Sequence, residues 1–233
     1  ARTLVDITAD ILDGTDKYKG IPLGGRNLAP HFLGLAIMAF ACAYTVTGDG
    51  LYRDITDRYI ESALPLLPEM SASDRAYLLF GTSVCAAAFK DSGMLQVACS
   101  SADRLISNMG PAGNIPSEHS ETPAGKDLVD LIYTQNWATL GLGCLASLDS
   151  CREYRRAYAK SLNLLLRIQD NSPETHLNGC WRGMYNLSAG TWGGGDKYEG
   201  GKSSIYSGWT NAPISVILAL ELDGKSFIDL LAI

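Results

Sequence analysis

The sequence predicts an all-α fold in which helical hairpins stack into an (α/α) toroid. Helices that are apolar on every face alternate along the chain with amphipathic helices. The apolar helices begin about 45 to 50 residues apart until the last, a period in the range of helical repeats. Connections also alternate between tight turns and long loops. A ring of paired inner and outer helices accounts for all three observations.

The inner layer is predicted from four segments that are apolar nearly all round. Only a helix surrounded by protein tolerates that composition, so these segments should have low solvent exposure. They are Phe32–Thr47, Ala76–Lys90, Leu128–Leu148 and Asn211–Leu222.

The outer layer is predicted from the helices that follow, which carry charged residues on one face and apolar residues on the other. A further helix at Thr3–Asp13 leads into the first hairpin. The outer segments are Leu51–Leu67, Leu95–Asn108, Cys151–Gln169 and the short Ser226–Ala232.

Loop lengths predict where a functional site lies. Connections from inner to outer helices are turn-like, as at Gly48-Asp49-Gly50. Connections back to inner helices are long, at Gly14–Pro30, Met109–Gly125 and Asn171–Thr210, with the exception of Pro68–Asp74. The long loops should therefore meet at the N-terminal ends of the inner helices, and a site is expected there.

Composition bounds the class of protein. The 233 residues are 46% hydrophobic and 19% charged, which favours one globular domain over residues 1–233. The net charge of −6 gives no electrostatic support to a nucleic-acid or anionic-membrane partner. No segment is long and apolar enough for a membrane span. The numbering opens at Ala1 without a signal-peptide pattern, so we expect a processed or recombinant chain, or one excised from a longer polypeptide.

The six cysteines show no metal-ligand spacing. Cys42, Cys85, Cys99 and Cys144 lie in apolar helical runs, where a thiol usually serves as a small hydrophobic group. Neither a CxxC pair nor a Cys/His pattern occurs, so no metal and no cofactor is expected. Free thiols favour a reducing, cytoplasmic compartment.

The segment 178–211 is the richest in candidate binding residues. It contains Trp181, Trp192 and Trp209, and two carboxylates, Asp196 and Glu199, are flanked by glycines. Aromatic faces with nearby carboxylates suit sugar rings, which combine apolar C–H faces with hydroxyl edges. The alternative is a loop folded over the mouth of the ring, with its tryptophans filling the core.

A second candidate group surrounds the start of the third inner helix. Glu118 and His119 lie in the preceding loop. Asp127, Asp130 and Thr134 would share one face of that helix, where a buried carboxylate would have the shifted pKa that acid–base catalysts need. For Asp127 we favour a helix cap instead, and for Asp130 both interpretations stay open.

Arg26, ahead of the first inner helix, could hold a carboxylate or a sulfate, or pair with a neighbouring loop. The GxGxxG, Walker-type, GxSxG and HExxH patterns are absent.

Several features together resemble the six-hairpin glycosidase-like superfamily, which includes glycoside hydrolases and the toroid domains of polysaccharide lyases. They are the hairpin alternation, Asn136-Trp137 early in an inner helix, the outer helix closing in Ile168-Gln169-Asp170, and the aromatic and glycine-rich segment ending in Tyr206-Ser207-Gly208-Trp209-Thr210-Asn211. About four hairpins are counted rather than six, so the ring is open or completed by further domains or chains. The resemblance also permits a secreted protein.

The resemblance implies a carbohydrate-active enzyme, most simply a glycoside hydrolase. Its acid and base would come from Asp196, Glu199, Asp130 and Glu118, and its sugar contacts from Trp181, Trp192, Trp209, Tyr206 and Arg26. A polysaccharide lyase would instead use His119 or a tyrosine as base, with Arg26 steadying a uronate. A non-catalytic toroid that binds sugar or protein is the rival from another class. A terpenoid-cyclase-like toroid ranks last because neither DDxxD nor DxDD occurs.

Overall fold

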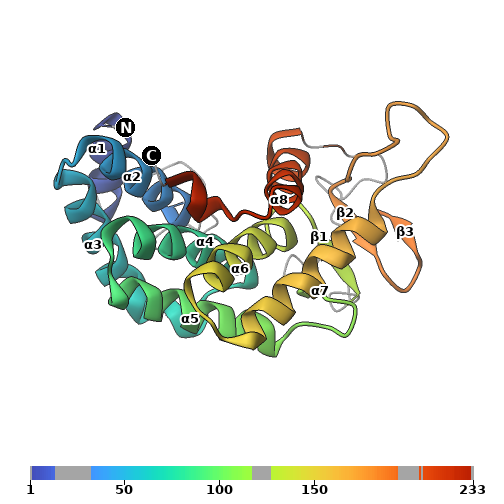
Figure 1. The fold of residues 1–233 in the computed structure, drawn as a ribbon, viewed down its shortest axis with the longest axis horizontal. Helices are drawn as coiled ribbons and strands as arrows, with labels where there is room; N and C mark the ends of the chain where they lie inside the picture. The colour runs from blue at the N-terminus through green and yellow to red at the C-terminus, as the bar shows by residue number, and fades with distance from the viewer. Residues whose placement is uncertain (1, 14–32, 117–126, 194–204, 206, 232–233) are drawn as a thin grey trace.

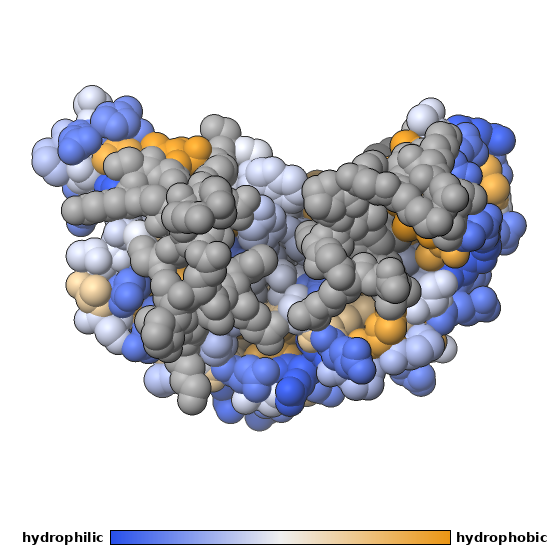
Figure 2. All heavy atoms as spheres, turned by 180° about the vertical axis from the view of Figure 1, so that it is seen from behind, coloured by the Kyte–Doolittle hydropathy of each residue, from blue (hydrophilic) through white to orange (hydrophobic). Residues whose placement is uncertain are grey.

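The structure is a computed structural model that describes residues 2–13, 33–116, 127–193, 205 and 207–231. It is predominantly helical, as predicted, and its outline is a crescent (Figure 1). The space-filling view shows the same outline hollowed between two arms (Figure 2). The helical elements are α1 (Arg2–Leu12), α2 (Leu33–Thr47), α3 (Leu51–Ala63), η2 (Leu64–Glu69), α4 (Ala72–Phe89), α5 (Ser92–Ser107), α6 (Gln135–Leu148), α7 (Arg152–Ile168), η3 (Ser207–Asn211), α8 (Ala212–Leu222) and η4 (Phe227–Leu231).

The helices form the two predicted layers. Helix α4 packs between α2 and α6, and α6 also contacts α8, so these four make one continuous inner row. Helices α3, α5 and α7 each pack against the inner helix that precedes them in the chain. The inner–outer alternation predicted from the apolar pattern is therefore confirmed.

The burial of the inner row is uneven, which corrects one expectation. Residues 75–86 of α4 are all buried, and α6 is buried over most of its length. The outermost members are not: α8 buries only Pro213, Ile214 and Ile217, and Val46 near the end of α2 is 74% exposed. Low exposure was wrong for α8 and for the last turn of α2, where residues 45–47 are exposed, because among the described residues each of these helices has an inner neighbour on one side only.

Two glycines set the close approach of α2 and α4. A Cβ built on Gly34 would lie 2.7 Å from the carbonyl carbon of Tyr77, and one on Gly81 would overlap the carbonyl oxygen of Gly34. The two backbones are thus in direct contact, which only residues without a side chain permit.

The third inner helix begins later than predicted. Residues Leu128–Asp130 form a strand, β1, and α6 starts only at Gln135. The intervening turn forms because Asp130 accepts hydrogen bonds from the backbone N–H groups of Ile132 (2.8 Å) and Tyr133 (3.0 Å). Such local side-chain bonds compete with helix formation. Asp127 therefore does not cap the helix, and Asp130 does not lie on it.

Prolines and turns shift the other helix boundaries. Helix α3 ends at Ala63 and continues as the 3-10 helix η2, which contains Pro68. Ser71 then begins α4 with a reciprocal cap, in which its side chain and that of Asp74 accept each other's backbone N–H groups. The short final helix is also of the 3-10 type.

A three-stranded antiparallel sheet, which the sequence did not predict, joins two of the long loops. Strand β2 (Met184–Asn186) lies between β1 and β3 (Thr191–Trp192). Tyr185 is paired with Val129 on one side and with Trp192 on the other. The sheet fastens the segment after α7 to the segment before α6.

Candidate functional site

Two loop regions meet at the N-terminal end of α6, as the loop lengths predicted. The buried Gln135 accepts a hydrogen bond from the backbone N–H of Ile115 (2.8 Å) and donates to the carbonyl of Gly113 (3.0 Å). Its amide also donates to Ser161 of α7 (2.6 Å). One side chain therefore holds the loop after α5 against both helices of the third hairpin.

Two asparagines attach the long segment between α7 and α8. The side chain of Asn136 donates to the carbonyl of Trp209. Asn211 accepts from the backbone N–H of Trp181 (2.9 Å) and donates to its carbonyl (2.8 Å), which mimics a strand pairing. These bonds place Trp209 and the sheet around the same helix ends.

Aromatic rings form a continuous series at this end of the molecule. Trp209 is 46% exposed, and its ring centroid lies 6.2 Å from that of Tyr133 and 6.5 Å from that of Trp137. Trp137 in turn lies 5.4 Å from Tyr77 and 6.1 Å from Phe80, both buried. These spacings suit attractive edge and tilted packing. The exposed indole is therefore supported from beneath by rigid aromatic groups.

Asp130 is fully buried, and its carboxylate accepts hydrogen bonds from neighbouring residues of the same turn. Besides the two backbone donors, its second oxygen accepts from the hydroxyl of Thr134 (2.8 Å). This carboxylate organises the turn that carries Tyr133 toward Trp209. The helical face on which Asp130 was predicted to lie is not formed, and its place in an acid–base pair stays a prediction.

A buried ion pair stabilises the loop after α7. The guanidinium of Arg182 donates to Asp170 through two nitrogens, each at 2.6 Å, and both side chains are over 90% buried. Arg182 also lies 5.9 Å from the ring centroid of Trp192, which packs edge-on against Tyr185 at 5.0 Å. Sequence reasoning missed this pair, although an arginine between Trp181 and buried apolar residues signals a buried partner.

The three candidate tryptophans have different environments. Trp181 is 3% exposed and donates its indole N–H to the carbonyl of Leu165 (2.8 Å), as a core residue does. Trp192 is half-buried in the sheet, and only Trp209 presents a large exposed surface. The three therefore do not line one mouth together: the loop-filling interpretation describes Trp181, and the sugar-binding one suits Trp209.

Six candidates lie outside the described residues: Asp196, Glu199, Glu118, His119, Tyr206 and Arg26. Two of the boundaries between described and undescribed residues, at 127 and 193, lie next to the sheet. The backbone N–H of Leu187 donates to the carbonyl of Asp127, and that of Gly193 donates to the carbonyl of Met184.

Within the described ranges, no group of three or more His, Cys, Asp and Glu side chains is placed to hold a metal ion. No helix in those ranges has the length and apolarity needed to cross a membrane.

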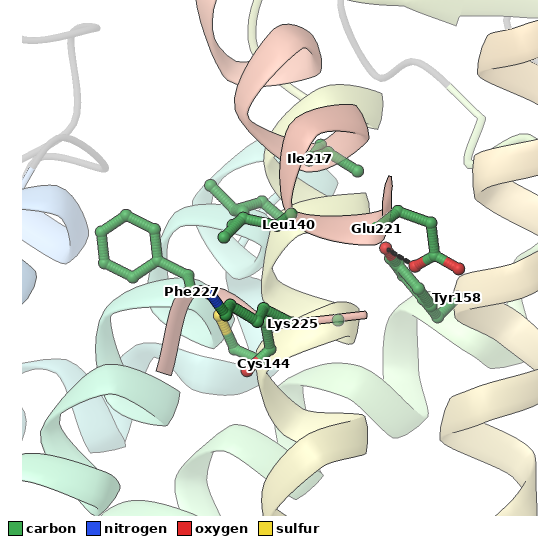
Figure 3. A pocket seen from close by; sticks show the side chains of 10 residues that line it. Leu140, Cys144, Tyr158, Ile217, Glu221, Lys225 and Phe227 are labelled. Atoms are coloured by element: carbon green, nitrogen blue, oxygen red, sulfur yellow. Dashed lines mark hydrogen bonds between the residues drawn. The ribbon is translucent and has the colours of Figure 1, made fainter. Parts of the chain in front are cut away.

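Two cavities lined by described residues lie away from this end. One of about 50 Å³ lies between α6, α7, α8 and the start of η4 (Figure 3). Tyr158 and Glu221 hydrogen-bond across it at 2.9 Å, and Leu140, Cys144 and Phe227 line it. It has room for a water molecule but not for a sugar. A larger groove lies on the outer face, between α3 and α5.

Comparison with solved structures decides the fold. A complex named for a UGL variant with dGlcA-Glc-Rha-Glc superposes with a TM-score of 0.56, at 17% identity over 78% of this chain and 50% of that one. An unsaturated glucuronyl hydrolase from Streptococcus agalactiae superposes with a TM-score of 0.55, at 12% identity over 77% of this chain and 43% of that one. Both are (α/α) six-hairpin proteins.

The chain has an all-α fold of (α/α) toroid type, similar to the fold of these two structures. The chain spans about half the length of the two solved structures. No protein-family model matches the sequence, and no curated protein matches it.

Proposed function

We propose that this toroid is part of a carbohydrate-active enzyme of the glycoside hydrolase type, with its sugar site at the N-terminal ends of α6 and α8. The observation that carries the proposal is Trp209, a half-exposed indole backed by Tyr133 and Trp137. A rigid, exposed aromatic face offers the apolar C–H face of a sugar ring a contact that needs little ordering on binding.

The proposed chemistry is hydrolysis by a pair of carboxyl groups. One carboxylic acid protonates the oxygen of the leaving sugar, and one carboxylate activates the attacking water or attacks the sugar itself. Asp196, Glu199 and Glu118 are the proposed acid and base, and His119 is the further candidate. Asp130 is proposed only to position Tyr133, since its oxygens are already engaged.

The proposed substrate class is an oligosaccharide that carries a uronate. Support comes from the names of the two solved structures, which refer to glucuronyl hydrolysis and to a sugar chain that begins with dGlcA. Arg26 is the proposed partner of the sugar carboxylate, and Tyr206 and Trp192 are proposed as further sugar contacts.

The test measures reducing ends released from uronate-terminated oligosaccharides, with Asp196→Asn and Glu199→Gln as variants. Loss of a general acid or base should lower turnover about a hundredfold or more at an unchanged melting temperature. Glu153→Gln, which removes an exposed acid on α7, is the matched control. New ultraviolet absorbance from a C=C bond, in place of hydrolysis, would identify a lyase.

A non-catalytic sugar-binding toroid is the second candidate, favoured by the local hydrogen bonds that already engage the carboxylate of Asp130. It would show sugar binding by calorimetry without turnover, and both carboxyl variants would keep full affinity.

A further inference from the structure

The outer face of the toroid contains a groove that the proposed sugar site does not use. The groove has a volume of about 590 Å³ and lies between α3 and α5, with η2 at one end. That volume falls within the range of about 300–1,000 Å³ that is usual for ligand sites. It is the larger of the two cavities noted in the described part of the chain.

The floor of the groove is apolar. Ile60 of α3 and Met94 and Val97 of α5 line it, and each of these side chains is mostly buried, at 5–8% exposure. At the far end Leu64 and Leu67 of η2 extend the apolar surface, and Leu64 is 43% exposed. An apolar side chain placed here would remove both its own surface and that of Leu64 from water.

The rim of the groove is acidic. Asp57 and Glu61 lie one turn apart on α3, and Asp91 faces them from the start of α5. No lysine, arginine or histidine is among the described residues that line the groove. Three carboxylates thus border the apolar floor without a lining cation.

One arginine beside the groove offsets only part of this charge. Arg53 pairs with Asp91 at 2.6 Å and more loosely with Asp57 at 3.6 Å, and it lies over the ring of Phe89. Glu61 forms no ion pair within the described residues. Burial, followed by the nearby Asp91 and Asp54 charges, raises the pKa of Asp57 against the lowering effect of Arg53. A second cation near Asp57 would therefore be favourable.

We infer that this groove binds a segment of a partner protein in which basic side chains are interspersed with large apolar ones. The apolar side chains would cover Ile60, Met94 and Leu64, and the basic ones would pair with Asp57 and Glu61. The lining positions 57, 60 and 61 of α3 and 64 at the start of η2 lie on one face over about two turns, which provides a linear track for a peptide. The inference is independent of the proposed sugar chemistry.

The experiment uses three fluorescein-labelled nine-residue peptides and fluorescence anisotropy. The first consists of three Leu-Lys-Ser repeats, the second replaces Lys with Glu, and the third replaces Leu with Ser. We expect the first to bind about tenfold or more tightly than either of the others, because charge and apolar burial both contribute. Its affinity should fall as NaCl is raised, since the rim is exposed to solvent.

A matched pair of double variants assigns the binding to the groove. Glu61→Lys with Leu64→Asp should abolish binding of the Leu-Lys-Ser peptide, and both positions are exposed, so folding should be kept. Glu153→Lys with Leu166→Asp makes the same changes on exposed positions of α7 and should leave binding intact.

Equal loss in the two double variants, or equal affinity for all three peptides, would overturn the inference. Binding of a cationic detergent below its micelle concentration, without binding of the peptide, would also overturn it and would indicate a small-molecule site instead.

Discussion

Trp209 and Trp181 show how strongly the surroundings decide the role of one residue type. Both lie in the segment that the sequence marks as a sugar-binding candidate. Trp181 packs in the core with its indole N–H bonded to Leu165, whereas Trp209 exposes nearly half of its surface over Tyr133. Truncation of Trp181 should therefore lower the stability of the protein, whereas truncation of Trp209 should weaken sugar binding.

We expect Trp181→Ala to lower the free energy of unfolding by about 3–5 kcal/mol, the usual cost of emptying a large aromatic core position. Trp209→Ala should cost much less stability but weaken oligosaccharide affinity about tenfold. Urea titration gives the first quantity and isothermal calorimetry the second. If Trp209→Ala were as destabilising as Trp181→Ala, the exposed ring would be a packing residue and the proposed site would lose its main support.

At the scale of elements, the crossing of α2 and α4 is the closest contact that the glycines reveal. Gly34 and Gly81 face each other there, and neither position has room for a methyl group. Because α4 also packs against α6, displacement of α2 would disturb the middle of the inner row.

We expect Gly81→Ala to lower the free energy of unfolding by about 1–3 kcal/mol, the usual cost of overpacking, despite the better helix propensity of alanine. Gly208→Ala is the control, since a Cβ there meets no atom within 4 Å. Thermal melting of both variants measures the difference. An unchanged or raised melting temperature for Gly81→Ala would show that the two helices can separate at little cost.

At the scale of the whole molecule, burial differs between the middle and the ends of the open crescent. The middle of the inner row is sealed by neighbours on both sides, whereas α8 leaves Val216 and Leu222 exposed, the latter at 89%. Opening of the molecule should therefore be easiest at its ends and hardest around α4 and α6.

The reactivity of the six free cysteines should follow this difference in burial between the middle and the ends of the molecule. Cys85 in α4 and Cys144 in α6 are fully buried, and burial raises the pKa of both thiols, so they should resist alkylation until the protein unfolds. Cys151 is exposed and should react at once. Iodoacetamide labelling followed by mass spectrometry in increasing urea measures the order. Labelling of Cys85 before the cooperative transition would contradict a sealed centre.

The same thiols predict the direction of alkaline destabilisation. The thiol of an unfolded cysteine has a pKa of about 8.5, and burial raises the pKa of Cys85 and Cys144 above that value in the folded protein. The native state therefore holds these protons more tightly than the unfolded state does. Stability should be complete below about pH 8 and fall as the pH rises toward about 10. Replacement of both residues by alanine should flatten the melting temperature over that interval, and an equally steep fall in that variant would exclude the thiols as its cause.

The sequence by itself determined the helical class, the inner–outer alternation and the meeting of two loop regions at the N-terminal end of α6. These follow from apolar periodicity and from turn residues, both of which act over a few neighbouring positions. They suffice to place α4 between α2 and α6. The same patterns predict that loops meet at the N-terminal end of α6.

Only the tertiary structure decided which face of each element is used. The apolar run from Leu128 is compatible with a helix or a strand, and its pairing with Met184–Asn186 selects the strand. Burial of Trp181 and exposure of Trp209 depend on how a single loop packs, which no local pattern encodes. The same holds for the Asp170–Arg182 pair and for the groove between α3 and α5, because each joins residues from separate elements whose distance is set by packing.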